Sequence, residues 1–242
     1  MGALTLAIAL TLLGQAQDDP KPQAADLAAA LQKTARKGPF AFSGTLKTEV
    51  NPDDADEEAT VCAVSGAVSP GAFAVAQIKG DASVHELLLK GGKMAGRETW
   101  KGHPLDLINA PSELMSLLDF DRLAIYVKDA GSVKALPDEK DGAEELRVCE
   151  LALSKGTIRS YHDEAEAAEE EEKSVRGVTL KLRLRKSDGL VAGIDAAVRR
   201  LYKDDDKPTE GTKGLSAFSL RLKEHGTAEV AVPSGLDKLL RD

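Results

Sequence analysis

The chain of 242 residues has few of the side chains that metal and redox chemistry use most. It contains one tryptophan, two cysteines and four histidines. No two histidines are spaced as in the H-x-x-x-H or H-E-x-x-H patterns of helical zinc sites. The two cysteines lie too far apart in the sequence for a known zinc-ligand spacing. The sequence therefore predicts neither a metal nor a cofactor.

Motifs of catalysis are also missing. There is no G-x-S-x-G elbow, no P-loop and no G-x-G-x-x-G after a strand pattern. The 40 acidic residues are abundant in loops, so they indicate no preferred acid–base pair. The sequence predicts a protein that is not an enzyme. A hydrolase whose residues converge only in the folded chain is the alternative.

The chain carries an excess of acidic side chains and no basic patch. Its formal net charge at pH 7 is −8. Nucleic acids and anionic membrane surfaces attract positively charged proteins. The composition therefore argues against both as partners.

The first residues have the pattern of a signal peptide. An apolar run from Leu4 to Leu13 is too short to cross a bilayer, and Gly14 and Ala16 occupy the small-residue positions of a cleavage site. This segment has no Lys or Arg, so a short buried helix is the alternative reading. We expect cleavage after Ala16, a spacer over 17–23, no membrane span in the mature chain, and a secreted or periplasmic location.

The two cysteines, Cys62 and Cys149, leave two possibilities open. In an oxidising compartment they can form one disulfide. Alternatively they are two buried free thiols on strands, since free cysteine behaves as a small apolar side chain.

The strongest structural pattern lies between residues 177 and 198. Apolar residues occupy every second position on both sides of an Asp188-Gly189 turn, which predicts a β-hairpin with one buried face. The alternating apolar positions are Val178, Leu180, Leu182 and Leu184, followed by Leu190, Ala192, Ile194, Ala196 and Val198. Such a hairpin needs more strands and a covering helix to bury its apolar face.

Similar patterns continue along the chain. Helices are expected at 24–37, 111–118, 121–128 and 155–173, with a short one starting at 236. Strands are expected at 40–48, 59–68, 72–78, 83–90, 93–97, 133–136, 145–153, 215–223 and 227–232, with polar or charged loops at 137–142 and 203–213. Hairpins outnumber crossovers. The fold class is therefore α+β: a single domain over 24–242 with a curved antiparallel sheet, an N-terminal helix and inserted helices covering one face.

Four segments resemble the LolA-like and LppX-like lipoprotein-carrier family, whose half-barrel encloses an apolar cavity closed by helices. Residues 40–46 (FAFSGTL), after the first helix, resemble the family's F-x-G-x-φ strand, where φ is apolar. Residues 65–73 (SGAVSPGAF) resemble its Pro-Gly hairpin. Residues 185–191 (RKSDGLV) resemble a turn in its second half, and residues 218–233 resemble the closing strands before a V-x-V-P segment.

The resemblance covers nearly the whole mature chain and implies a half-barrel that binds an apolar ligand. Lipoprotein carriers usually have an arginine after the motif phenylalanine, and here Ala74 follows Phe73. The resemblance therefore implies the broader superfamily of apolar-ligand binders rather than lipoprotein carriage, and no functional residue can be transferred by position.

If the hairpins curve around the inserted helices, ten side chains are expected to line an apolar pocket. They are Phe42, Leu46, Phe73, Val75, Leu88, Leu118, Phe120, Leu180, Leu182 and Ile194. The predicted function is binding, without chemistry, of a lipid or another apolar small molecule, with a lipoprotein or an envelope protein as a further candidate partner. The alternative is an interaction protein in which these side chains form a closed core.

Overall fold

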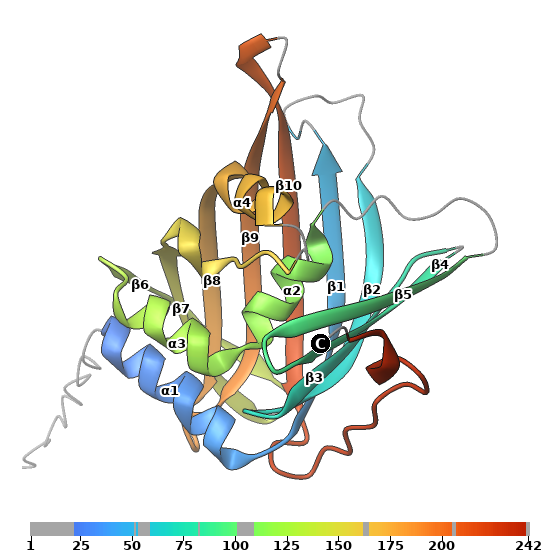
Figure 1. The fold of residues 1–242 in the computed structure, drawn as a ribbon. Helices are drawn as coiled ribbons and strands as arrows, with labels where there is room; N and C mark the ends of the chain where they lie inside the picture. Colours follow the sequence, from blue (N-terminus) through green and yellow to red (C-terminus); the bar gives the residue numbers. More distant parts are fainter. Residues whose placement is uncertain are drawn as a thin grey trace, which may run out of the picture.

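The computed structural model describes residues 22–240 except 51, 53–58, 82, 101–108, 162–164 and 205–206. The signal peptide expected at residues 1–16 lies outside the described residues, as does most of the spacer. Within the described part, ten strands form one antiparallel sheet in the order β5-β4-β3-β2-β1-β10-β9-β8-β7-β6. The sheet is curved and open, with β5 and β6 at its two edges (Figure 1).

The strands follow one another along the chain mostly as hairpins. Their bounds are β1 Phe40–Val50, β2 Thr60–Ser69, β3 Phe73–Lys79, β4 Ser83–Lys90, β5 Lys93–Trp100, β6 Val133–Asp141, β7 Glu144–Leu153, β8 Val175–Arg185, β9 Val191–Asp204 and β10 Lys207–Lys223. The one long-range pairing joins β1 to β10, with Ala41 opposite Lys223. The α+β class predicted from the sequence is confirmed.

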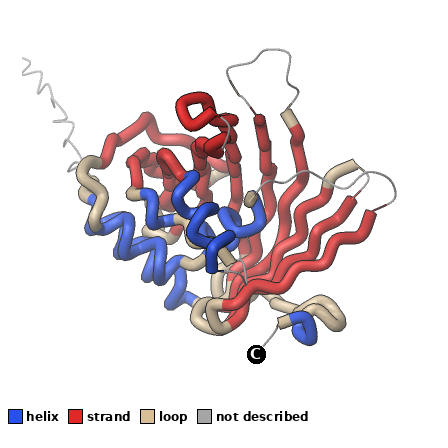
Figure 2. The backbone as a smooth tube through the Cα atoms, turned by 45° about the horizontal axis from the view of Figure 1, so that its top comes forward, coloured by secondary structure: helices blue, strands red, loops and turns tan. Residues whose placement is uncertain are grey.

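In the part of the chain that the structure describes, four α-helices accompany the sheet, and its concave side holds a helix layer (Figure 2). They are α1 Ala24–Lys37, α2 Ala110–Leu118, α3 Phe120–Lys128 and α4 Ala165–Ser174, with short 3₁₀ turns at Lys155–Thr157 and Asp237–Leu239. Helix α1 packs on α3, and α4 packs on β8 and β9. In α1 the apolar residues recur on one face, so Leu27 and Leu31 are fully buried.

The hairpin of β8 and β9 has the predicted apolar face, with one irregularity. Leu180, Leu182 and Ile194 are fully buried. The register shifts between Arg183 and Leu184, however, so Val191 is buried and Ala192 is only half-buried. A β-bulge of this kind inserts one residue and reverses the alternation on its strand.

Three segments differ from the sequence prediction. Residues 155–173 are not one helix: α4 begins only at Ala165, because Ile158 is buried in the core and leads an extended stretch. The expected loop at 203–213 is mostly strand, since β9 and β10 continue into it. The expected loop at 137–142 is also mostly strand, because β6 runs to Asp141.

The strand predicted at 227–232 is not formed. Strand β10 already pairs with β1 on one side and β9 on the other, so no free edge remains beside it. Glu224 and Gly226, both with positive φ, turn the chain out of the sheet. The following segment carries Val230 and Leu236 onto a separate apolar cluster.

Two glycines on the concave face allow the sheet to curve. A Cβ atom at Gly44 would overlap the carbonyl group of Ser219, and one at Gly66 would overlap the carbonyl oxygen of Val75 and the ring of Phe42. The two glycines lie on the paired strands β1 and β2, with Phe42 opposite Gly66. Glycine within a strand marks such close backbone approaches.

We expect Gly44→Ala and Gly66→Ala each to lower the free energy of unfolding by about 3 kcal/mol, because overpacking at backbone atoms forces the strands apart. Urea denaturation measures the change. Gly177→Ala on β8 is the control, since a Cβ there meets nothing within 4 Å. Equal effects at all three positions would contradict this origin of the curvature.

Candidate functional site

Seven of the ten predicted pocket residues lie in the main core between the sheet and the helices. They are Phe42, Leu46, Leu118, Phe120, Leu180, Leu182 and Ile194, and none is more than 3% exposed. Their neighbours in this core come from both the concave face and the helix layer. The interior is therefore filled by side chains along most of its length.

Two of the other three predicted residues, Val75 and Leu88, face the opposite way. Val75 and Leu88 are opposite one another on β3 and β4 and belong to a second apolar cluster, against which Phe73 packs. Their strand neighbours Ala74 and Leu87 belong to the main core. Successive side chains of a strand point to opposite faces, so Val75 and Leu88 lie on the outer side of the sheet. Residues 74–76 are small and apolar throughout, which left the phase of β3 undetermined from the sequence.

A pocket of about 190 Å³ opens at one edge of the interior. It lies between the end of α2, the start of α3 and the turns that join β2 to β3 and β4 to β5. Three of the predicted residues line it: Phe73, Leu118 and Phe120. Phe40 also lines it, stacked on Phe120 with 4.9 Å between ring centroids.

Polar groups stand at the rim of this pocket. The guanidinium of Arg159 lies over the ring of Tyr161, 5.5 Å from its centroid. The backbone N–H of Arg159 donates to the hydroxyl oxygen of Ser116 at 3.0 Å, which ties the rim to α2. Burial raises the pKa of Tyr161, so its hydroxyl stays neutral. The sequence pattern predicts a helix over this segment and therefore does not indicate the rim.

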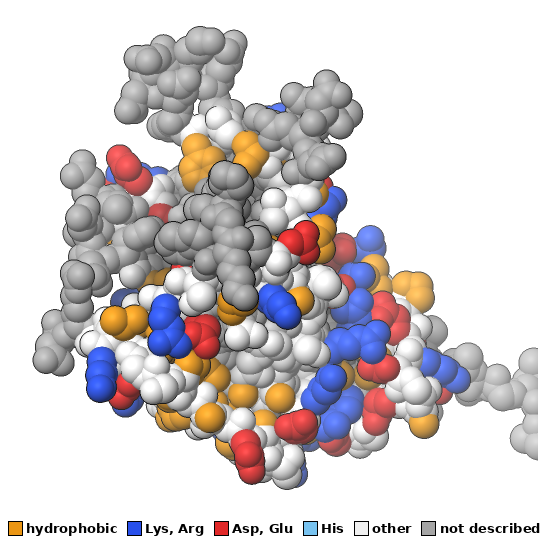
Figure 3. All heavy atoms as spheres, turned by 90° about the vertical axis from the view of Figure 1, so that its right-hand side faces the viewer, with side chains coloured by type: hydrophobic (Ala, Val, Ile, Leu, Met, Phe, Trp, Pro, Cys, Tyr) orange, Lys and Arg blue, Asp and Glu red, His pale blue; other side chains and the backbone are white. Residues whose placement is uncertain are grey.

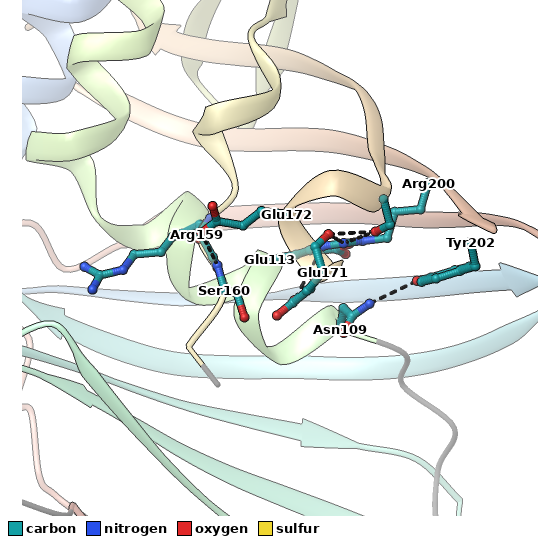
Figure 4. Close-up of polar contacts among 10 residues, drawn as sticks. Asn109, Glu113, Arg159, Ser160, Glu171, Glu172, Arg200 and Tyr202 are labelled. Atoms are coloured by element: carbon teal, nitrogen blue, oxygen red, sulfur yellow. Dashed lines mark hydrogen bonds and ion pairs between the residues drawn. The ribbon is translucent and has the colours of Figure 1, made fainter. Parts of the chain in front are cut away.

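A second polar group is buried inside the protein, where Arg200 of β9 meets two carboxylates (Figure 4). Its Nε donates to Oε1 of Glu113 on α2 at 2.6 Å, and its Nη2 lies 3.5 Å from Oε1 of Glu171 on α4. The three side chains are 2%, 0% and 3% exposed. We call these three residues the Arg200 cluster.

Two hydrogen bonds to the C-terminal end of α4 complete the contacts of Arg200. Nη1 of Arg200 donates to the carbonyl oxygen of Glu171 at 2.6 Å and to the hydroxyl of Ser174 at 2.7 Å, in the last turn of α4. A cation at a helix C-terminus is favourable because carbonyl groups there lack helical partners. One arginine thus holds both α2 and α4 to the sheet.

Burial sets the ionisation of the groups around Arg200. Desolvation raises the pKa of Glu113, and the nearby Arg200 charge opposes this effect. Burial also raises the pKa of Tyr202 to about 12. The phenolic oxygen of Tyr202 accepts a hydrogen bond of 3.1 Å from Asn109 at the start of α2.

Sequence periodicity indicates that Arg200 is buried, although no functional motif contains it. Ile194, Ala196 and Val198 alternate on the buried face, and Arg200 is the next residue in this period. A charged residue at a buried strand position requires a partner of opposite charge. Glu113 within the apolar helix sequence PSELMSLL is such a partner.

The two cysteines are free and buried. Cys62 lies on β2 and Cys149 on β7, with β1, β10, β9 and β8 between them in the sheet. Five strand spacings correspond to about 24 Å along the sheet, whereas the Cα atoms of a disulfide are usually about 6 Å apart. The disulfide that the sequence left open is not formed. Burial raises the pKa of both thiols.

The outer side of the sheet differs in character from the interior. Ion pairs occur there, such as Arg183 with Asp195 at 2.8 Å. On the face shown in Figure 3, basic and acidic side chains are interspersed.

Among the described residues, no three His, Cys, Asp or Glu side chains gather to hold a metal, and no helix is long and apolar enough to cross a membrane.

Comparisons with known proteins give structural matches only. No family model and no curated protein matches the sequence. The chain is similar to the solved structures of LprF from Mycobacterium bovis (14% identity, TM-score 0.40) and of lipoprotein LppX from Mycobacterium tuberculosis (9%, 0.38). A LolA superfamily protein from Nitrosomonas europaea is a further match (13%, 0.28).

These matches extend over most of each chain. They cover 88%, 87% and 89% of this chain and 97%, 98% and 97% of the other. Two of these proteins, LppX and the LolA superfamily protein, bear the names of the family that the sequence motifs resemble.

We expect Arg200→Met to lower the free energy of unfolding by about 3–5 kcal/mol, because it leaves the buried acidic side chains of Glu113 and Glu171 without their cation. Thermal or urea denaturation measures the loss. The matched control is Arg199→Met, one residue earlier on β9 and exposed, which should change stability by less than about 0.5 kcal/mol. A mild effect of Arg200→Met would show that the Arg200 cluster does not hold the helices.

His225 gives the structure a pH dependence near the pocket. Its Nε2 donates to the carbonyl oxygen of Val191 at 2.8 Å, and its ring lies 6.2 Å from that of Phe40. Burial lowers the pKa of His225 below its ordinary 6.5. Below pH 6.5 the unfolded chain therefore takes up a proton that the folded chain does not.

We expect wild-type protein to lose stability relative to His225→Gln as the pH falls from about 7 to 5, because only the wild type carries this unequal protonation. Urea denaturation at a series of pH values gives both profiles. Parallel profiles would mean that His225 titrates alike in the folded and unfolded chain.

Proposed function

We propose that the protein is exported and binds a lipid or another apolar molecule, without chemistry, between its curved sheet and its helix layer. The observation that carries this proposal is the continuity of the edge pocket with the apolar interior. Phe40, Leu118 and Phe120 line the pocket and also belong to the main core. The wall that these three residues form between the pocket and the core is therefore apolar.

The size of the pocket determines how a ligand is accommodated. Its volume of about 190 Å³ is smaller than the ~300–1,000 Å³ of typical small-molecule sites. It has room for one end of an apolar ligand. Binding of a whole lipid requires helices α2 and α3, whose junction at Asp119 forms one wall, to move away from the sheet.

The well-filled core favours one alternative. Leu46, Leu180 and Ile194 are fully buried, as expected for a protein whose interior only stabilises the fold. In that case the protein is an envelope or extracellular interaction protein without a ligand. The two functions differ in whether the interior opens.

Native mass spectrometry of the mature protein from its own host, with lipid extraction of the same sample, tests the proposal. We expect a co-purified apolar ligand at one copy per chain, because desolvated apolar surface holds such molecules strongly. An unliganded mass, together with no uptake of added fatty acids or phospholipids, would contradict the binding function and favour the interaction protein.

A variant that fills the pocket tests its location. Ala72 is exposed and lines the pocket, so Ala72→Trp should block it at little cost to the fold. We expect at least about a tenfold loss of affinity for a fluorescent fatty-acid probe, corresponding to about 1.4 kcal/mol. Ala63→Trp is the control, at an exposed position on β2. Equal binding by both variants would place the ligand elsewhere.

A further inference from the structure

We propose that the Arg200 cluster is a proton-dependent latch, so that opening of the helix layer releases a proton and is favoured by rising pH. The inference rests on the proposed function only in that the open state admits the ligand. The latch itself concerns α2, α4 and β9, and its operation can be measured without any ligand.

The three side chains connect both helices to the sheet. Glu113, Glu171 and Arg200 come from α2, α4 and β9, and each is almost completely buried. Helix α2 ends at the junction with α3 that forms one wall of the pocket. Moving α2 or α4 away from the sheet therefore separates a carboxylate from Arg200 and exposes both to water.

The three side chains of the Arg200 cluster carry unequal numbers of negative and positive charges. Two carboxylates face one guanidinium, so the closed cluster has a net charge of −1 when both are ionised. A buried charge without compensation is costly, and proteins avoid it by binding a proton. Retaining one proton makes the closed cluster neutral.

Glu113 is the side chain suited to hold that proton. Its Oε1 accepts the hydrogen bond from Arg200, whereas its Oε2 has no hydrogen-bond partner among the described residues. A proton on Oε2 leaves the bond to Arg200 intact. The raised pKa of Glu113, caused first by desolvation, agrees with this assignment.

The other groups around Glu113 do not replace the proton. Tyr202 on β9 stays neutral because its pKa is raised to about 12. The Ser216 hydroxyl on β10 lowers the pKa of Glu113 as a hydrogen-bond partner, but it carries no charge, and the desolvation of Glu113 outweighs it. Glu171 adds negative charge and so opposes ionisation of Glu113. Arg200 is the cation that acts on Glu113 in this environment.

The direction of the pH effect follows from linkage. In the open state Glu113 is in water and has its ordinary pKa of 4.5, whereas in the closed state its pKa is higher. The closed state therefore binds the proton more tightly. Raising the pH from 4.5 through the higher pKa that Glu113 has in the closed state favours opening. Lowering the pH through the same range favours closure.

The buried thiols Cys62 and Cys149 report opening without a ligand. Both lie in the main core, 2% and 0% exposed, so they react only when the interior opens. The measured quantity is the ratio of two alkylation rates with iodoacetamide, that of the folded protein and that of the urea-unfolded chain at the same pH. Taking this ratio removes the dependence of the rate on thiolate concentration. For wild type we expect this ratio to rise between pH 5 and 8, by up to about tenfold for each unit of raised pKa.

Glu113→Gln keeps the shape of the side chain and the acceptor for Arg200 but cannot ionise, so its ratio should be independent of pH. Glu170→Gln, an exposed neighbour of Glu171, is the control and should behave as wild type. Glu171→Gln removes the second carboxylate and should flatten the profile as well, which tests the latch even where Glu113→Gln fails to fold. The proposal is overturned if folded Glu113→Gln or Glu171→Gln shows the same rise of the alkylation ratio with pH as wild type.

Binding of a fluorescent fatty-acid probe, measured at the same pH values, separates the latch from the proposed function. The latch and the binding function are both supported if wild type binds the probe more tightly at higher pH while the affinity of Glu113→Gln stays constant. Thiol exposure that depends on Glu113, without probe uptake at any pH, supports the latch and contradicts the binding function. Probe uptake with the same pH dependence in both proteins contradicts the latch and leaves the binding function standing.

Discussion

The close approach of backbone to backbone at Gly44 and Gly66 is the constraint on which the rest of the structure depends. Without side chains at these two positions, β1 and β2 bend toward the concave side, and the ring of Phe42 lies over Gly66. The bend gives the sheet a concave face. The burial of apolar side chains between this face and the helices is the main contribution that keeps the helices in place. The pocket lies where the helices leave part of this interior uncovered.

The fold was largely predictable because its signals are local. Strict alternation through Leu180 and Leu182, and glycines at the turns, predict hairpins whatever surrounds them. The errors occur where tertiary structure overrides local pattern: Val230 lies in a strand-like sequence, yet β10 has no free edge to pair with it. The phase of β3 was undetermined because Ala74, Val75 and Ala76 are alike in size and polarity, and only packing decides which of them faces inward.

The residues of the pocket are harder to predict for a related reason. Leu118 and Phe120, expected to line a pocket, lie in the interior, whereas the rim residues Arg159 and Tyr161 follow Ile158, whose burial is a tertiary contact. The partners Arg200 and Glu113 lie 87 residues apart in the chain. Each looks ordinary by itself, and only the paired burial of opposite charges distinguishes them from surface residues. Sequence periodicity places Arg200 inside, whereas three-dimensional structure is needed to show what it meets there.

The pairing of β1 with β10 has a consequence for how the chain folds. The first strand has no partner on that side until nearly the whole polypeptide is present, since Ala41 lies opposite Lys223. The two edges of the sheet, β5 and β6, come instead from the middle of the chain. Joining strands so distant in sequence gives a high contact order and slow folding. Among the described strands, β10 is therefore the one that joins the two halves of the sheet, β1 to β5 and β6 to β9.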